Sequence, residues 1–575
     1  MKLLEALQVL RKAPADGEPF VVALACGFEP LHLETFLAAH LQRAMPARRI
    51  AVRSGLYGDL AGNVGRLAQA GAVAAAVVVE WADLDPRLGL RNRGGWDPAS
   101  LPHVLDSARM RLSQTEAALS GAALPPVALC LPTLPLPPAD CVPGWQAGHL
   151  ALELHALVVG FAARVAKGGA RVVDAQRLAE VSPPAQRLDA RSELRSGFPY
   201  SLPHASAVAE LLARLLCPPA PKKGLITDLD ETLWRGILGE AGVAGVTWDL
   251  DHHSQTHALY QQLLHSLAAA GVLIAVASRN DPDLVGQALA REDLLLPRNC
   301  LFPVEANWGQ KSASIARILR QWNVGPDSVV FVDDSPMELA EVKAAHPEVE
   351  CLLYPTEDDA ASVALLGRLR DLFGKETITE EDGLRLKSLR ASGAAKAAEK
   401  GGASLDDFLR QADGELTVDF RAEPPDPRAL ELVNKTNQFN LNGVRFTEGE
   451  WRARLARPGA FLLVASYGDK YGPLGKIAAV AGRAEEGILR IETWVMSCRA
   501  FGRRIEHGCL AALFERLGAA EAVFDFQPMP RNGPFQAFLE DLLGAPPESA
   551  ARLTRERFAQ ACPPLFHHVR EVMND

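Results

Sequence analysis

The chain has 575 residues, of which 48% are hydrophobic and 23% are charged, a composition typical of soluble globular proteins. This length exceeds what one hydrophobic core accommodates and predicts three or four domains. The net charge of -10 disfavours a general nucleic-acid binder, which needs a basic surface. The nine cysteines are scattered and none forms a C-x-x-C pair, which disfavours a disulfide scaffold and a zinc site.

The N-terminal segment has helical periodicity and lacks the long apolar run and the small-residue cleavage site of a signal peptide. Apolar stretches such as residues 70–85 are too short and too soon interrupted to span a bilayer. We therefore expect a cytoplasmic protein in a reducing compartment, with neither nucleic acid nor membrane as a partner.

Apolar runs alternate with helical stretches over residues 1–220, which predicts a parallel sheet covered by helices on both faces. A joint rich in proline and lysine, residues 217–223, ends this first block. The second block, 221–375, shows the same alternation. A charged, alanine-rich stretch, 376–402, then predicts a helical connector.

The third block, residues 403–575, differs because its predicted strands cluster between helices. Strands are expected at 414–420, 459–468, 475–484 and 487–496, and helices at 429–440 and 503–518. This order is typical of an α+β domain. The chain is therefore predicted to be a multidomain α/β protein with two parallel sheets and one α+β domain.

Two carboxylates follow the first predicted strand of the second block, in the sequence ITDLDETLW. Asp228 and Asp230 stand where that buried strand ends, which is where open α/β sheets bind ligands. A turn between them separates their roles, so one can attack phosphorus while the other transfers a proton. Buried carboxylates need a cation, and hard oxygen ligands favour Mg²⁺.

Three further segments carry side chains suited to a phosphate group. Ser278 ends a second predicted strand, Lys311 offers a positive charge, and Asp333 and Asp334 end a third strand. A metal, a fixed cation and hydroxyl donors are the components of phosphoryl transfer. Each segment alone has a simpler explanation as a turn, a surface residue or a helix cap. The occurrence of all four in order, three of them at strand ends, favours a site.

These four segments resemble the motifs of the haloacid dehalogenase (HAD) superfamily. The resemblance implies that Asp228 is a nucleophile forming an aspartyl-phosphate and that Asp230 is the general acid and base. It also implies a Mg²⁺ site formed by Asp228, the backbone carbonyl of Asp230, Asp333 and Asp334, and phosphate binding by Thr232, Ser278, Arg279 and Lys311. Residues 233–277 leave room for a small flap but not for a full lid domain, so we expect an open site suited to a large or protein-borne substrate.

Longer stretches resemble one family of this superfamily, the FkbH-like proteins, and NKTNQFNL at 434–441 is its most specific segment. The resemblance covers nearly the whole chain. It implies an enzyme that dephosphorylates 1,3-bisphosphoglycerate, a small phosphorylated three-carbon acid, and loads the glyceryl group onto the phosphopantetheine thiol of an acyl carrier protein in polyketide-type biosynthesis.

One position departs from that family. Members often have a cysteine directly before the S-[KR]-N segment, where this chain has Ala277. An acyl-enzyme route needs a thiolate near the site. Cys300 is the nearest alternative along the chain, but its setting indicates a structural residue at the start of a loop. The thioester thus forms directly on the carrier thiol, or another cysteine serves, or this chain lacks glyceryl transfer.

The third block resembles the GNAT acyltransferase fold, in which a glycine loop opens a helix and binds a pyrophosphate or pantetheine arm. The corresponding segment begins at Arg499, includes Gly502, and has Arg504 in place of the last glycine. Cys498 precedes it and is either a catalytic thiol or a buried strand-end residue. The candidate acyl- or pantetheine-binding residues are Asn434, Asn437, Gln438, Asn440, Cys498, Arg499 and Gly502.

The first block resembles the SGNH-hydrolase fold but lacks the residues of that active site. Such hydrolases need a serine in the first loop and a late D-x-x-H pair. Here the first loop contains Cys26, Asp174 has no histidine three residues on, and His204 lies thirty residues later. We interpret this block as a non-hydrolytic scaffold or docking domain, with Cys26 as a nucleophile the alternative.

The leading hypothesis is thus a Mg²⁺-dependent, FkbH-like glyceryl transferase and phosphatase. The first alternative is a HAD phosphatase for another small phosphorylated substrate, without acyl transfer. The second is a non-catalytic module that binds a phosphorylated ligand or a carrier protein.

Overall fold

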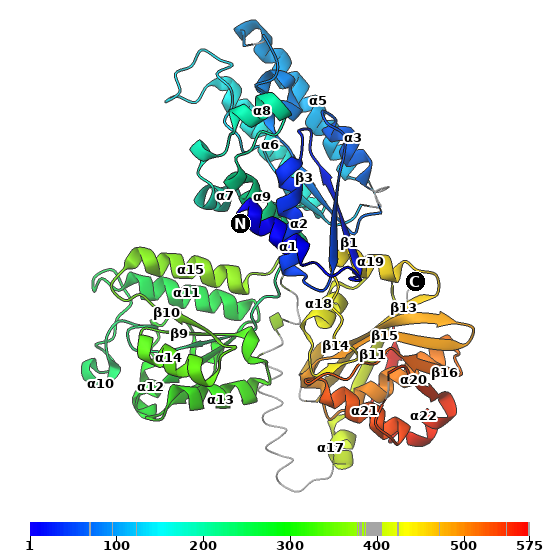
Figure 1. Ribbon diagram of the computed structural model, residues 1–575. Coiled ribbons are helices and arrows are strands. Elements are labelled where there is room, and N and C mark those ends of the chain that lie inside the picture. Colours follow the sequence, from blue (N-terminus) through cyan, green and yellow to red (C-terminus); the bar gives the residue numbers. More distant parts are fainter. Residues whose placement is uncertain are drawn as a thin grey trace. The chain divides into compact units, whose positions relative to one another are not determined.

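The computed structural model of the protein describes residues 1–67, 71–94, 96–121, 124–376, 378, 382–383, 386, 405–422, 425–470, 472–547 and 549–572 (Figure 1). The chain divides into two compact units. The first contains residues 1–219 and 446–454, and the second contains residues 220–445 and 455–575. Most of the predicted connector, 376–402, lies outside the described residues.

A five-stranded parallel sheet forms the centre of the first unit. Its strand order is β2-β1-β3-β4-β5. The strands are β1 (Pro19–Ala25), β2 (Arg49–Ser54), β3 (Ala74–Val78), β4 (Val127–Cys130) and β5 (Arg171–Val172). The chain adds β2 on one side of β1 and β3 on the other, so the strand order reverses between β1 and β3.

Helices cover both faces of this sheet. They are α1 (Leu3–Arg11), α2 (Leu31–Ala44), α3 (Leu60–Gly65), α4 (Trp81–Leu84), α5 (Leu101–Leu119), α6 (His149–Lys167), α7 (Ala175–Val181), α8 (Ala190–Ser196) and α9 (Leu202–Leu216). Successive residues of β1 face opposite layers, as the strand period of two requires. Leu24 packs in a core formed with α2 and α9, and Ala25 packs in a core formed with α5 and α6.

A short segment from late in the chain completes the first unit. Helix α19 (Glu448–Leu455) is held there by ion pairs from Arg171 to Glu448 and from Arg48 to Glu450, both with N–O distances below 3 Å. No feature of the sequence indicated that residues 446–454 would group with the first block.

Helix α6 is long and apolar enough to cross a membrane by length and composition, and it is the one such helix in the described part of the chain. Its inner side chains, among them Leu154 and Phe161, are fully buried in the core of the first unit. A core helix passes the same test, so this finding is weak evidence for a membrane span.

The second unit contains another five-stranded parallel sheet, with the order β10-β9-β6-β7-β8. The strands are β6 (Gly224–Thr227), β7 (Leu273–Ser278), β8 (Leu301–Ala306), β9 (Val329–Asp333) and β10 (Glu350–Leu353). The helices are α10 (Leu238–Ala241), α11 (Gln255–Ala269), α12 (Pro282–Ala288), α13 (Lys311–Trp322), α14 (Pro336–Ala345) and α15 (Asp359–Phe373).

Two helical layers enclose this sheet, with α11 and α15 on one face and α13 and α14 on the other (Figure 1). On β6, Leu225 belongs to the first layer and Ile226 to the second. The indole of Trp322 packs so closely on the start of β6 that a β-carbon on Gly224 would lie 2.4 Å from it. Glycine is therefore required where α13 meets the sheet.

The rest of the second unit is built on a mixed eight-stranded sheet. Its order is β17-β16-β15-β14-β13-β11-β18, and β12 pairs with β15. The elements are α17 (Leu405–Ala412), β11 (Glu415–Asp419), α18 (Pro427–Lys435), β12 (Phe439–Asn440), β13 (Ala460–Asp469), β14 (Gly472–Glu485), β15 (Ile488–Met496), α20 (Ile505–Leu517), β16 (Glu521–Phe524), α21 (Gly533–Leu543), β17 (Ala551–Thr554), α22 (Arg555–Ala561) and β18 (His568–Glu571). Its core is aromatic, with Trp494 stacked near Phe524.

The predicted fold class, a multidomain α/β protein, is confirmed by these two parallel sheets and the mixed sheet. One helix prediction was wrong. The helix expected at 429–440 ends at Lys435, because the next residues have poor helix propensity and Thr436 takes an extended backbone before β12. The more specific SGNH-like and GNAT-like assignments stay predictions.

Candidate active site

Three parallel strands of the second unit bring carboxylates and a hydroxyl to one edge of the sheet. Asp228 directly follows β6, Ser278 is the last residue of β7, and Asp333 is the last residue of β9. The backbone N–H of Asp228 donates to the carbonyl oxygen of Val332 at 3.0 Å, which continues the β6–β9 pairing. Parallel strands that end in register therefore place these side chains together.

Lys311 joins the two buried carboxylates. It is the first residue of α13, and only 5% of it is exposed. Its Nζ lies 2.9 Å from Asp228 Oδ2 and 2.6 Å from Asp333 Oδ2. A buried ammonium group between two carboxylates offsets part of their repulsion, and it leaves an excess of negative charge at the site.

The surroundings of these charged groups shift their pKa values. Burial raises the pKa of Asp228 to about 7, with Lys311 opposing the shift and Asp333 adding to it. Burial, followed by Asp333, also raises the pKa of Asp334. Burial disfavours the charged form of Lys311, but the neighbouring carboxylates outweigh burial and raise its pKa. The site thus favours a bound cation, which would stabilise the carboxylates in their charged forms.

The carboxylate arrangement fits a hard divalent cation. One oxygen from each of Asp228, Asp333 and Asp334 lies within 4.8 Å of the other two. Asp228 Oδ1 is buried and has no hydrogen-bond partner, whereas its Oδ2 is held by Lys311. An unpartnered buried carboxylate oxygen beside two further carboxylates is typical of a metal-binding site.

Asp230 is oriented by a turn and by a residue that sequence reasoning missed. Glu231, which follows it, has a left-handed φ of 52° and turns the chain away from the strand direction. Asp230 Oδ1 accepts from Trp234 Nε1 at 3.0 Å, and Oδ2 accepts from Asn280 Nδ2 at 2.9 Å. Asn280 Nδ2 also donates to Ser278 Oγ at 3.1 Å. Asn280 lies two residues after Ser278 and is the last residue of the S-[KR]-N segment, which is the signal that could have marked it.

The predicted phosphate-binding residues differ in accessibility. Thr232 and Ser278 are buried, and Thr232 Oγ1 has no hydrogen-bond partner. Arg279 lies at the mouth, where its side chain is 40% exposed and its Nη1 pairs with Glu338 Oε1 at 2.8 Å. The structure therefore brings Asp228, Asp230, Thr232, Ser278, Lys311, Asp333 and Asp334 to one site, with Arg279 at its entrance.

The segment between Thr232 and α11 is small, as the spacing predicted. It contains only α10 and isolated bridges, and its Trp234 and Val246 are buried in the domain core. Two large apolar side chains are more than 70% exposed nearby, Trp308 on the loop that leads to Lys311 and Met337 in the first turn of α14. Within the described part of the second unit the site therefore has no lid domain, and its margin is apolar.

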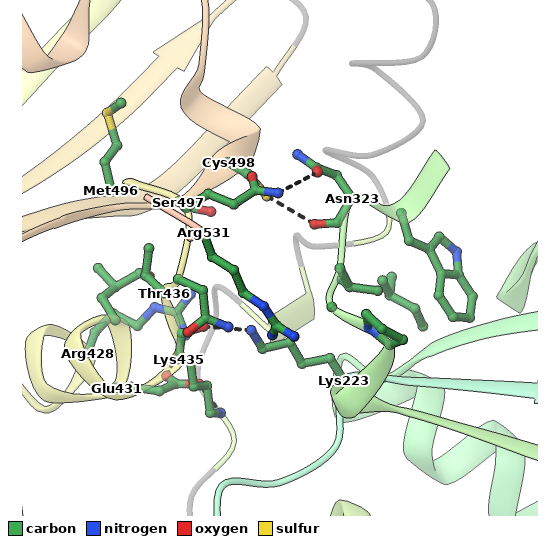
Figure 2. A pocket seen from close by; sticks show the side chains of 18 residues that line it. Lys223, Asn323, Arg428, Glu431, Lys435, Thr436, Met496, Ser497, Cys498 and Arg531 are labelled. Atoms are coloured by element: carbon green, nitrogen blue, oxygen red, sulfur yellow. Dashed lines mark hydrogen bonds and ion pairs between the residues drawn. The ribbon is translucent and has the colours of Figure 1, made fainter. Parts of the chain in front are cut away.

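The candidate residues of the third block do not form one site. Asn437, Gln438 and Cys498 line a cavity of about 400 Å³ in the second unit (Figure 2). Asn440 instead closes a turn, where its side-chain oxygen accepts from the backbone of Asn442 and Gly443. Neither Asn434 nor Gly502 lines the cavity, and the side chain of Arg499 lies outside the described residues.

This cavity and the carboxylate site lie at opposite edges of the parallel sheet. Figure 2 shows Cys498 beside Asn323, to whose carbonyl oxygen its Sγ is 3.5 Å distant. Asn323 precedes β9 and Lys223, also in the lining, precedes β6. Asp228 follows β6, so the length of that strand, roughly 16 Å, separates the two edges. The Cys498 thiol is therefore remote from the carboxylates.

Two other cysteines of the second unit, Cys300 and Cys351, do not lie at the carboxylate edge either. Cys300 ends a short 3-10 helix before β8, at the amino end of that strand, and Cys351 lies within β10. Ala277 is fully buried in the core layer formed with α13. A side chain at position 277 thus faces the core, while the next residue, Ser278, faces the site.

The first unit offers no exposed nucleophile at the predicted position. Cys26 is 3% exposed, its Sγ donates to the Phe28 carbonyl oxygen, and burial raises its pKa. His204 is fully buried and bonded to Thr133 Oγ1 at 2.8 Å and to Ser182 Oγ at 2.9 Å. Cys26 and His204 therefore form hydrogen bonds within the core of the first unit.

No protein-family profile matches the chain, and no curated protein matches it. Among solved structures, it is similar to the N-terminal part of the protein BF1531 from Bacteroides fragilis, described as containing a phosphatase domain complexed with Mg. The identity is 19%, the TM-score is 0.52, and the match covers 66% of this chain and all of that one. An uncharacterized protein from Corynebacterium glutamicum matches 27% of this chain at 22% identity, covering 98% of its own length, with a TM-score of 0.19 that carries no argument. The first similarity shows the fold.

Proposed function

We propose that this chain is a Mg²⁺-dependent phosphatase of the HAD type. The observation that carries the proposal is the unpartnered Asp228 Oδ1 within the carboxylate cluster, with Lys311 fixed beside it. The Mg-complexed phosphatase domain of the similar structure supports the same assignment. Asp228, Asp333 and Asp334 would hold the Mg²⁺, which supplies positive charge that stabilises the phosphate in the transition state.

The chain's own residues account for the two steps. Asp228 attacks phosphorus, the bond to the leaving oxygen breaks, and Asp230 donates a proton to that oxygen. A water molecule then attacks the aspartyl-phosphate while Asp230 accepts its proton, and inorganic phosphate leaves. Asn280 holds the Asp230 carboxylate in place between the two steps. Ser278, Thr232 and Lys311 contact the phosphate oxygens.

We further propose a phosphorylated three-carbon acid as substrate and a phosphopantetheinylated carrier protein as acceptor. The FkbH-like segments and the apolar margin of the site at Trp308 and Met337 support this proposal. In that reaction the carrier thiol loses its proton and attacks the acyl carbon, the bond from that carbon to the phosphate oxygen breaks, and a thioester and inorganic phosphate result. Water releases the second phosphate from its ester.

A phosphatase without acyl transfer is the second candidate. It is favoured because none of Cys300, Cys351 and Cys498 of the second unit lies at the carboxylate edge. A direct attack by the carrier thiol needs no enzyme thiol. The two candidates therefore differ in whether a carrier protein accepts the acyl group.

Incubation with 1,3-bisphosphoglycerate, Mg²⁺ and a phosphopantetheinylated carrier separates the candidates. A glyceryl mass on the carrier in intact-protein mass spectrometry, together with released phosphate, supports transfer, and phosphate release with unmodified carrier supports the plain phosphatase. Asp228→Asn removes the nucleophile and should lower phosphate release by about 10⁴-fold or more. Asp251→Asn, an exposed carboxylate in the small segment before α11, is the matched control and should retain activity. Undiminished phosphate release by Asp228→Asn would overturn the assignment.

A further inference from the structure

A second cavity, of about 370 Å³, lies wholly within the first unit. Gly27 and Phe28, which follow β1, and Glu80 and Trp81, which follow β3, form part of its wall. It therefore opens at the carboxyl edge of the sheet, where the strand order reverses between β1 and β3. Open parallel sheets bind ligands at this point. The phosphoryl-transfer site uses the other parallel sheet and leaves this cavity without a role.

Two pairs of opposite charges line the cavity. Asp83 on α4 is influenced by Arg111 on α5, and Glu193 on α8 is influenced by Arg91. Burial raises the pKa of Asp83 to about 7, and Arg111 opposes the shift. Burial likewise raises the pKa of Glu193, and Arg91 opposes it.

The side chains of each pair form no ion pair in the described part of the first unit. Arg91 Nη1 instead donates to the backbone carbonyl oxygen of Glu193 at 2.6 Å, which leaves the Glu193 carboxylate without it. Arg111 Nε and Glu193 Oε2 are shielded from solvent and lack any hydrogen-bond partner. Buried polar atoms are normally paired, so one donor and one acceptor at the same cavity indicate a missing partner that carries both kinds of group.

The remaining wall suits an apolar body. It is formed mainly by Phe28, Leu60, Trp81, Leu88, Leu134, Pro135 and Pro137. The Trp81 ring is fixed because its Nε1 donates to the Leu134 carbonyl oxygen at 2.8 Å. Glu80, the third acidic residue of the lining, is held by Thr133 and Tyr200, so its hydrogen bonds are made within the protein.

The floor of the cavity depends on a glycine. A β-carbon on Gly27 would lie 1.8 Å from Asp83 Oδ1, so only glycine leaves space for the Asp83 carboxylate at this place. The carboxylate is further fixed because its Oδ2 accepts from the backbone N–H of Glu80 at 2.8 Å. Asp83 is thus presented to the cavity in a defined position.

We propose that this cavity binds a small zwitterion of the amino-acid type, whose ammonium group meets Asp83 and Glu193 and whose carboxylate meets Arg111. The apolar side chain of the ligand packs against Trp81 and the leucines. Such a ligand supplies the missing acceptor and the missing donor together, and its own charges cancel, so the two charge pairs of the cavity stay balanced.

Thermal shift assays on the full chain with each of the twenty standard L-amino acids at 10 mM test the proposal. At least one should raise the melting temperature by about 2 °C or more. Calorimetric titration of the best one then gives its dissociation constant. Arg111→Gln and Glu193→Gln should each weaken binding by about 10- to 100-fold, because each removes a charged partner. Arg109→Gln on the exposed face of α5 and Glu180→Gln on α7 are controls that should bind normally.

Fragments of the ligand separate a zwitterion from a single charge. The matching amine, which lacks the carboxylate, and the matching acid, which lacks the amino group, should each bind at least about tenfold more weakly. The proposal is overturned if no amino acid shifts the melting temperature, if either fragment binds as well as the amino acid, or if the two variants bind like the controls. Phosphate release does not enter this test, so its result is independent of the proposed function.

Discussion

The two parallel sheets of this protein end in carboxyl edges of opposite character. At the edge of β6 and β9, carboxylates are left with an unpartnered oxygen and a raised pKa, held by the single ammonium group of Lys311. At the edge of β3 and β4, the buried Glu80 accepts from Thr133 and Tyr200, and Thr133 also bonds His204. We call the first the reactive edge, because it carries the proposed phosphatase site, and the Glu80 network of the second the closed edge, because its hydrogen bonds are made within the protein. The fold alone does not distinguish the two networks; the pairing of their carboxylates does.

Among the changes that test this comparison, the largest effect is expected from removing the ammonium group of Lys311. Lys311→Met leaves Asp228 and Asp333 buried without their ammonium partner. We expect the second unit to lose about 3–5 kcal/mol of unfolding free energy and phosphate release to fall by at least about 10³-fold. Chemical denaturation and steady-state kinetics measure the two effects. Arg320→Met, an exposed change on the same helix, should alter neither. Normal activity in Lys311→Met would remove the contrast between the edges.

A smaller effect is expected at Asn280, which orients Asp230 without contacting phosphorus. Asn280→Ala frees the Asp230 carboxylate and should lower kcat by about 10- to 100-fold with little change in KM, because only the proton transfer loses its geometry. Initial-rate kinetics check this, with the exposed Asn299→Ala as control. A rise in KM at constant kcat would assign Asn280 to substrate binding instead.

The closed edge should respond in stability alone. Thr133→Val keeps the shape of the side chain but removes its hydrogen bonds to Glu80 and His204. We expect the first unit to lose about 1–3 kcal/mol, while phosphate release stays within about twofold. Thr35→Val on the exposed face of α2 is the control. If Thr133→Val lowers phosphate release without unfolding, the closed network takes part in the reaction.

The most gradual effect is a pH dependence of the closed edge, because it is spread over several pH units. Burial, with Arg187 second, lowers the pKa of His204 from its usual 6.5 to about 3. The folded state therefore holds fewer protons than the unfolded state between these values, and stability present above pH 6.5 is lost as the pH falls toward 3. The slope is at most about 1.4 kcal/mol per pH unit. Denaturation of wild type and His204→Gln at pH 7, 5.5 and 4 should show their difference shrinking with acidity. A constant difference would mean that His204 does not titrate.

Sequence reasoning located the reactive edge because its residues lie in short contiguous strings at strand ends. Asp228, Ser278 and Asp333 each end a strongly apolar run, and parallel pairing alone brings such ends together. Asn280 ends the S-[KR]-N segment but was missed, because the chemistry of a single amide does not by itself indicate that it orients a carboxylate. The succession of two parallel sheets and an α+β domain along the chain followed from the alternation of apolar and helical stretches. The small segment before α11 followed from the spacing between Thr232 and Ser278.

The closed edge could not be predicted in the same way. Glu80, Thr133 and His204 are far apart in sequence, and each stands in an ordinary local context. Their association depends on which helix covers which strand, which is a tertiary property. Likewise the helix prediction for 429–440 overran, since propensity alone places the end of a helix only within a few residues. The grouping of residues 446–454 with the first unit rests on ion pairs that no local pattern encodes.

The close approach of Gly27 and Asp83 has a consequence for how this unit could change its chemistry. A serine or cysteine at position 27 would stand in the loop that follows β1, but its β-carbon would overlap the Asp83 carboxylate. Introduction of a nucleophilic side chain at position 27 therefore requires a coordinated double substitution at positions 27 and 83. Each single step is handicapped, the first by a steric clash and the second by loss of the Asp83 cap at the backbone of Glu80. An engineer, or an evolving lineage, would have to make both changes together.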